Sequence, residues 1–166
     1  MESIEALIAR HPFLRTMRPE HVAVLAEGAH RAEFEAGQLV FREREIAYHC
    51  YLIQSGVVAL ESHVPGSGDV IIQTLGKDEA LGWSWLFAPY LLHFQARALE
   101  RTGALCLNGA HLLVACEKDH DFGYELMKRV SQLLITRMQA TRRQLMALHQ
   151  HQESSNRPAR APRKRN

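Results

Sequence analysis

The segment 81–100, LGWSWLFAPYLLHFQARALE, holds the side chains that are best suited to bind a ligand. Trp83 and Trp85, the two tryptophans of the chain, lie on either side of Ser84. Phe87 and Tyr90 add further aromatic rings after them. Rings around a small hydroxyl are typical of a lining on which a flat ligand stacks. The same rings could instead fill the interior and leave no room for a ligand, so both interpretations stay open.

The other reactive residue types form no recognisable catalytic or metal-binding set. The ten histidines include no HxxxH pair, and the three cysteines, Cys50, Cys106 and Cys116, form no CxxC pair and no zinc spacing. Ser84 lacks the GxSxG pattern of a nucleophile elbow. We therefore expect a protein that is not an enzyme, has no fixed metal or cofactor, and carries its cysteines as buried free thiols.

Length and composition indicate one ordinary globular domain. The chain has 166 residues, of which 46% are hydrophobic, enough to bury a core without disulfides or metals. Apolar runs stay far below the ~18 residues that a membrane span needs. The first ten residues, MESIEALIAR, show no basic region followed by an apolar one, so no secretory signal is indicated. We expect a cytoplasmic protein without a membrane partner.

The positive charge is concentrated at the C-terminus. The last fourteen residues carry five cationic side chains and one acid, a net charge of +4, whereas the whole chain carries +2; the remainder is therefore at −2. Proline, serine and repeated charge predict a disordered basic tail over residues 151–166, after a domain that spans 1–150. Such a tail would bind nucleic acid weakly, if at all, and in a salt-dependent manner.

Hydrophobic periodicity predicts a mainly β fold with flanking helices. Helical spacing over 2–14 and 17–29 is followed by short apolar runs separated by turn residues, as in a sandwich or barrel. Residues 58–75 read as a hairpin with a Gly-rich tip. Helical spacing returns over 110–119 and then, without a proline, over 121–150. The predicted strands contain the runs QLVF, CYLI, VVALES, VIIQTL, FQARAL and ALCL.

The long helix repeats like one strand of a coiled coil. Apolar or small residues recur at intervals of seven in two rows that are offset by four. The final turns have little remaining chain to pack against, which favours a seam between two copies of the chain. The predicted dimer interface consists of Met127, Leu134, Met138, Thr141 and Leu145.

Four stretches in this order resemble the cyclic nucleotide-binding domain of the Crp/Fnr superfamily, the group of the catabolite activator protein. They are FEAGQLVF with Gly37, YLIQSGVVAL with Gly56, VIIQTLGKDEALG with Gly82, and MQATRRQL with Thr141. The resemblance covers roughly residues 5–148 and implies a β-roll (jelly-roll-like) followed by a long dimerisation helix. It also implies a stand-alone domain, because the eighteen residues after Leu148 show no helix-turn-helix pattern.

The resemblance further implies a ligand site at the segment 81–100. In the family a short cassette of Gly-Glu, a helix turn and an arginine holds a cyclic phosphate, and the long helix closes over the base. Here Gly82 is kept, but Trp83 stands at the glutamate position, and Leu92 or His93 stands at the arginine position. The resemblance and the pattern together assign as ligand-binding residues Ile72, Leu75, Leu81, Gly82, Trp83, Ser84, Trp85, His93, Arg97 and Thr141.

These departures predict a changed ligand. A buried phosphate without a charge-assisted partner is costly, so we expect a non-enzymatic sensor or regulatory module that acts through a protein partner and does not take a standard cyclic nucleotide. One alternative is a genuine cyclic AMP or cyclic GMP binding protein that holds the phosphate with backbone amides, His93 and Arg97. Another is a ligand-free structural or accessory dimer with a filled pocket.

Overall fold

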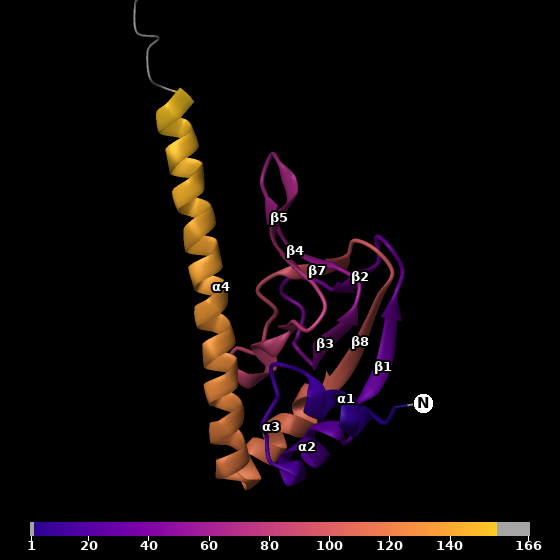
Figure 1. Cartoon of the computed structure of the whole chain (residues 1–166). Coiled ribbons are helices and arrows are strands. Elements are labelled where there is room, and N and C mark those ends of the chain that lie inside the picture. Colours follow the sequence, from indigo (N-terminus) through magenta and orange to yellow (C-terminus); the bar gives the residue numbers. More distant parts are fainter. Residues whose placement is uncertain (1, 156–166) are drawn as a thin grey trace, which may run out of the picture. The chain divides into compact units, whose positions relative to one another are not determined.

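The computed structural model describes residues 2–155 of the chain, which divides into two compact units, Met1–Ser131 and Gln132–Asn166. The first unit contains all the strands (Figure 1). The described part of the second unit is one helical segment. In the described part of the chain, no helix combines the length and the hydropathy that a bilayer span requires.

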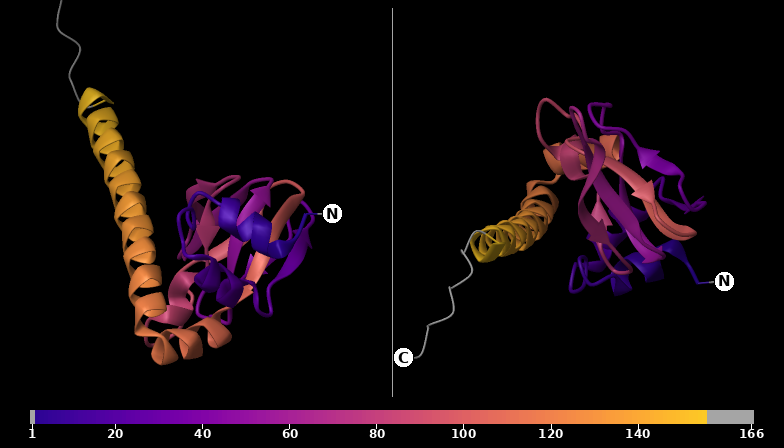
Figure 2. Two further views of the ribbon diagram at one scale, coloured as in Figure 1. Left: turned by 60° about the horizontal axis from the view of Figure 1, so that its bottom comes forward. Right: turned by 90° about the horizontal axis from the view of Figure 1, so that it is seen from above.

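Two antiparallel four-stranded sheets form the first unit (Figures 1 and 2), which confirms the predicted mainly β fold. The order in one sheet is β1-β8-β3-β6 and in the other β2-β7-β4-β5. The first sheet comprises β1 (His30–Phe34), β8 (Thr102–Asn108), β3 (His49–Ser55) and β6 (Ala80–Leu81). The second comprises β2 (Leu39–Phe41), β7 (Gln95–Ala98), β4 (Val58–Val64) and β5 (Gly68–Leu75).

The core forms where the apolar sides of these strands meet. Alternation along β7 buries Ala96 and Ala98 completely and leaves Arg97 partly exposed on the other face. Strand alternation in the run FQARAL predicts this orientation of Arg97, opposite to that of the two alanines, and the burial pattern agrees with it. A continuous hydrophobic cluster is made by Ile53, Val58, Leu60, Leu75, Leu81 and Ala96.

The predicted hairpin over 58–75 is present as β4 and β5, whose register runs from Val58 opposite Leu75 to Val64 opposite Gly68. Gly66 and Gly68 have φ angles of 83° and 77° at the tip, a conformation that L-residues avoid. The hairpin projects beyond the sheets (Figure 1).

The short helices of the first unit gather at one end of the sheets (Figure 1). They are α1 (Ile4–Arg10), α2 (Pro19–Ala26) and α3 (Gly109–Lys118). The first two are shorter than the predicted segments 2–14 and 17–29, whereas α3 lies within one residue of the predicted 110–119. Ser3 caps α1 by accepting a hydrogen bond from the Ala6 amide, and the Asn108 side chain accepts one from the His111 amide at the start of α3. Pro19 occupies the first turn of α2, as predicted.

The long helix α4 (His120–Ser155) begins where the Asp119 carboxylate accepts hydrogen bonds from the amides of Asp121 and Phe122. Within the first unit, Phe122, Leu126 and Val130 form a fully buried stripe at helical spacing. The helix extends five residues past the predicted end at 150, so residues 151–155 of the predicted tail are helical. Residues 156–166 lie outside the described residues.

Candidate ligand-binding site

A glycine fixes the start of the predicted cassette. Gly82 has a φ of 85°, and a Cβ there would lie 2.8 Å from the His49 carbonyl oxygen and 3.3 Å from the Cys50 Cα. Only glycine allows strand β6 to pass this close to β3 and then turn into the 3₁₀ helix η1 (Trp83–Leu86).

Both tryptophans of η1 lie in the core. Trp83 is 4% exposed and Trp85 is 2% exposed. The Trp83 ring packs on Phe13, with ring centroids 4.9 Å apart, and Trp85 lies against Gly109 at the start of α3. For these two rings, filling the interior agrees with the described packing, whereas Phe87 and Tyr90 are exposed.

Leu92 occupies a position that the family resemblance assigns to arginine, and its buried side chain lines a hollow of about 180 Å³. Phe41 and Tyr51 also line this hollow, and they pack on the hydrophobic cluster that contains Leu75 and Leu81. We call this the Leu92 hollow. Its complete lining is Val40, Phe41, Glu45, Ile46, Tyr48, His49, Tyr51 and Leu92.

The Leu92 hollow lacks a cationic side chain of fixed charge. Its ionisable groups are Glu45, His49 and two tyrosines. Desolvation lowers the pKa of His49, and nearby His30 lowers it further, so the neutral imidazole is favoured. Burial raises the pKa of the Tyr51 hydroxyl, which therefore stays protonated at neutral pH.

Arg97 is already paired within the protein. Its Nε donates to both carboxylate oxygens of Glu61 at 3.2 Å, and one Nη donates to the Gly37 carbonyl oxygen at 3.1 Å. The Glu61 side chain is 8% exposed, and it also accepts from Gln95 Nε2 at 2.7 Å. A ligand phosphate would have to compete with this carboxylate for Arg97.

The remaining predicted ligand residues are spread over several environments. Leu75 and Leu81 are buried in the hydrophobic cluster, whereas Ile72 and Ser84 are half-buried. His93 is exposed next to Leu92. Thr141 belongs to the second unit, where its hydroxyl donates to the Arg137 carbonyl oxygen at 3.1 Å.

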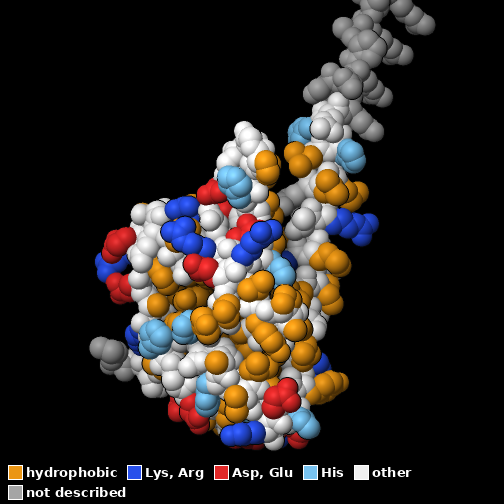
Figure 3. All heavy atoms as spheres, turned by 180° about the vertical axis from the view of Figure 1, so that it is seen from behind, with side chains coloured by type: hydrophobic (Ala, Val, Ile, Leu, Met, Phe, Trp, Pro, Cys, Tyr) orange, Lys and Arg blue, Asp and Glu red, His pale blue; other side chains and the backbone are white. Residues whose placement is uncertain are grey.

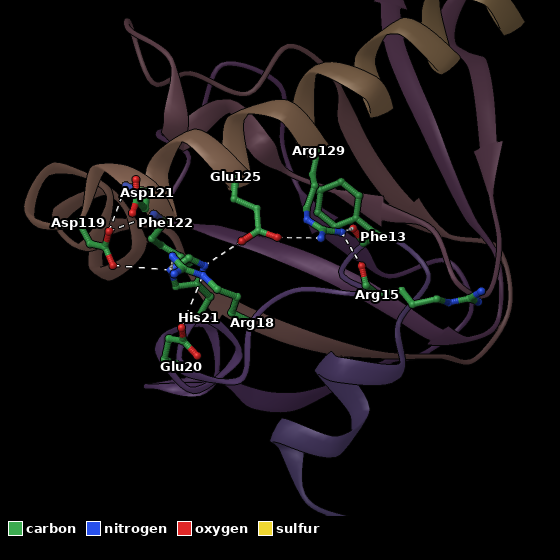
Figure 4. Close-up of polar contacts among 10 residues, drawn as sticks. All are labelled: Phe13, Arg15, Arg18, Glu20, His21, Asp119, Asp121, Phe122, Glu125 and Arg129. Atoms are coloured by element: carbon green, nitrogen blue, oxygen red, sulfur yellow. Dashed lines mark hydrogen bonds and ion pairs between the residues drawn. The ribbon is translucent and has the colours of Figure 1, made fainter.

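A polar network that the sequence did not suggest joins α2 to α4 (Figure 4). Arg18 donates to Nε2 of the buried His21 at 2.7 Å, and His21 Nδ1 donates to Glu125 at 2.8 Å. Because arginine can only donate, Nε2 accepts from Arg18, and Nδ1 carries the proton that is donated to Glu125. Arg129 Nη2 donates to Glu125 at 2.9 Å, and its Nη1 donates to the carbonyl oxygens of Phe13 and Arg15.

The cysteines are free, and Cys50 and Cys106 are buried while Cys116 is half-buried. Within residues 2–155, no group of three His, Cys, Asp or Glu side chains is arranged to hold a metal ion. His49 is exposed where Cys50 is fully buried, as expected for neighbours on a strand.

Comparison with known proteins places these features in a family context. The model of the cyclic nucleotide-binding domain matches residues 31–119. Among curated proteins, no match was found.

Three solved structures share the fold. A Geobacter metallireducens protein described as a cyclic nucleotide-binding protein is 26% identical, with a TM-score of 0.73 over 83% of this chain and 99% of its own. A cyclic nucleotide-binding domain from Methylobacillus flagellatus is 16% identical, with a TM-score of 0.72 over 87% and 82%. A cAMP-bound mutant of the regulatory subunit of a cAMP-independent protein kinase A from Trypanosoma brucei is 22% identical, with a TM-score of 0.62 over 75% and 44%.

Proposed function

Because this chain belongs to the cyclic nucleotide-binding domain family, we propose that it is a non-enzymatic regulatory module that senses a small molecule other than a standard cyclic nucleotide. The observation that carries the proposal is the lining of the Leu92 hollow. Leucine occupies a position that the family resemblance gives to the phosphate-binding arginine, and no lysine or arginine is among the lining residues.

The charge balance of the hollow disfavours a cyclic phosphate. A phosphate that leaves water needs a charge-assisted partner, and an unpaired buried charge costs several kcal/mol. Glu45 adds a carboxylate to the lining, which would repel a phosphate. The rings of Phe41, Tyr48 and Tyr51 offer stacking surface instead, so we expect a neutral ligand with a flat or apolar body.

One fold neighbour suggests a direct test. The T. brucei subunit belongs to a protein kinase A described as cAMP-independent, and the cAMP-bound form is a triple mutant in which one threonine becomes arginine. Leu92→Arg should therefore increase the affinity for cyclic AMP at least tenfold, and Leu92→Met, which conserves volume, should leave it unchanged. Calorimetry measures both variants. Equal cyclic AMP binding by wild type and Leu92→Arg would argue against position 92 as the phosphate-binding position.

Thermal-shift screening tests the ligand class. A ligand at a hundred times its Kd stabilises the folded state by about 2.7 kcal/mol, which gives a measurable rise in Tm. A rise with a flat neutral metabolite and none with cyclic AMP or cyclic GMP is the expected result. A rise with a cyclic nucleotide would favour a true cyclic nucleotide-binding protein. No rise with any compound would favour a structural dimer with a filled pocket.

The second unit supports a homodimer as the working form. Hydrophobic side chains recur along α4 (Figure 3), and Leu134, Met138 and Leu145 are 46%, 65% and 61% exposed in the single chain. Their alternating four- and seven-residue spacing fits a helix–helix seam with a second copy, to which Met127 and Thr141 would also contribute. In our proposal the ligand changes this dimer, which then acts on a protein partner. Three free cysteines favour a cytoplasmic location, where thiols stay reduced.

A further inference from the structure

A second hollow lies between the N-terminal segment and the sheets, and it shares no lining residue with the Leu92 hollow. Its volume of about 640 Å³ is in the range of small-molecule sites. The walls come from α1 and the segment that follows it, from β1 and β3, and from the turn between β5 and β6. Four cationic side chains line it: Arg10, Arg15, Arg31 and Lys77.

Two of these cations are unpaired. Arg10 forms an ion pair with the Glu2 side chain at 2.9 Å, and Arg31 donates to the Glu2 carbonyl oxygen at 2.8 Å. The side chains of Arg15 and Lys77 have no hydrogen-bond or ion-pair partner among residues 2–155, and Figure 4 shows the Arg15 side chain extending away from the contacts of its backbone. Their charge is available to a ligand.

A buried histidine donor also lines this hollow. His11 is 3% exposed, and its Nδ1 accepts a hydrogen bond from the Phe13 amide at 3.3 Å. The proton of the neutral ring is therefore on Nε2, which is buried and has no hydrogen-bond partner in the described part of the chain. An unsatisfied buried donor is unfavourable, and a ligand oxygen would satisfy it.

From these observations we propose that the second hollow binds a small phosphate-bearing polyanion. Arginine forks match phosphate oxygens in a bidentate manner, and Lys77 adds a point charge. Asp78 is the single carboxylate among the lining residues, so cations outnumber it four to one. The site is distinct from the cassette and does not depend on the function proposed for it.

The wall that carries Arg15 is held in place before any ligand arrives. Arg129 Nη1 donates to the carbonyl oxygens of Phe13 and Arg15 at 3.0 and 2.9 Å, and Glu125 in turn holds Arg129. A backbone that is fixed in advance loses less entropy on binding. The segment that carries Arg15 therefore links the proposed anion site to Arg129 of α4.

Calorimetry with pyrophosphate tests the site, using the full chain in a low-salt buffer free of phosphate. We expect saturable binding with one site per chain and a Kd below roughly 1 mM, and weaker binding of orthophosphate. Arg15→Gln and Lys77→Gln should each weaken pyrophosphate binding about threefold or more, and the double variant about tenfold, since each removes one partly screened charge contact. The matched control Arg42→Gln removes an exposed arginine outside the lining and should have no effect.

A second readout locates the ligand. In imidazole ¹⁵N–¹H spectra, pyrophosphate should shift the His11 Nε2–H signal of the wild type and should shift it less in the double variant at the same concentration. No saturable binding at millimolar pyrophosphate would overturn the proposal. So would a loss of affinity that follows Arg163→Gln and Arg165→Gln in the C-terminal tail while the Arg15 and Lys77 variants bind normally.

Discussion

Arg97 and Glu61 form an ion pair across neighbouring strands, with Arg97 Nε 3.2 Å from each carboxylate oxygen of Glu61 in a bifurcated hydrogen bond. The pair lies on the face of β7 opposite to the buried Ala96 and Ala98. The arginine of the cassette region therefore neutralises a largely buried acid of the protein itself. Because Arg97 is paired with Glu61, the chain can carry an arginine in this region that does not bind a phosphate.

Removing this arginine should reduce stability. Arg97→Gln leaves the Glu61 carboxylate with Gln95 as its side-chain donor, and we expect the free energy of unfolding to fall by about 1–3 kcal/mol. Urea denaturation measures the change. Arg101→Gln is a matched control, because its pair with Glu33 is solvent-exposed and should contribute less. Equal effects of the two variants would contradict the role assigned to the Glu61 pair.

Gly109 should tolerate no side chain. A Cβ at Gly109 would lie 2.4 Å from Cγ of Trp85, which is itself buried in the core. Gly109→Ala should therefore cost about 1–3 kcal/mol of unfolding free energy, the usual range for overpacking. Gly76→Ala is the control, since that position has open space and an ordinary φ. A Gly109→Ala protein with wild-type stability would mean that Trp85 is not packed there.

Stability should decrease as the pH falls from about 7 to 5.5. Burial lowers the pKa of His11 from 6.5, so below that pH the unfolded chain takes up a proton that the folded chain resists. The free energy of unfolding that the neutral His11 contributes is fully present above pH 6.5 and is lost as the pH falls toward the lowered pKa of His11. The lowered pKa of His49 acts in the same direction. Urea titrations at several pH values should give a smaller pH slope for His11→Gln than for wild type, and an unchanged slope would refute this assignment.

The assembly prediction concerns the seam on α4. Leu134→Glu combined with Met138→Glu places like charges in the proposed interface and should convert a dimer into monomers or aggregate. Light scattering distinguishes a dimer from the 18.9 kDa chain. Gln132→Glu with Gln139→Glu adds the same charge at exposed positions outside the seam and should leave the dimer intact. A wild-type protein that is monomeric at micromolar concentration would rule out the seam.

Local patterns in the sequence were sufficient to predict most of the fold. The change from helical spacing to short apolar runs and back located the helices and the strands β2, β3, β4, β5, β7 and β8, and the Gly-rich segment located the β4–β5 hairpin. The strand β6 has only two residues, Ala80 and Leu81, which are too few to show the two-residue hydrophobic alternation of a strand. It is defined by pairing with β3, which a local pattern does not reveal.

The site was less predictable because its contacts join distant segments. Alternation predicted the face of Arg97, but its partner Glu61 is 36 positions away. Trp85 is buried because Gly109, at the start of α3, leaves room for its ring. The second hollow, which binds the proposed polyanion, combines side chains from four separate stretches of the sequence. No local motif brings Arg15, Arg31 and Lys77 together.

Calorimetric titration of the wild-type protein with cyclic AMP at pH 7.5 tests the central claim most directly. An arginine–phosphate pair in a closed site contributes roughly 2–5 kcal/mol. Leucine in place of that arginine at position 92 should therefore weaken the affinity for cyclic AMP by about one and a half to nearly four decades. The account predicts no binding at pH 7.5, or binding no tighter than high micromolar. A nanomolar Kd would contradict it and would show that the chain holds a cyclic phosphate without the cassette arginine.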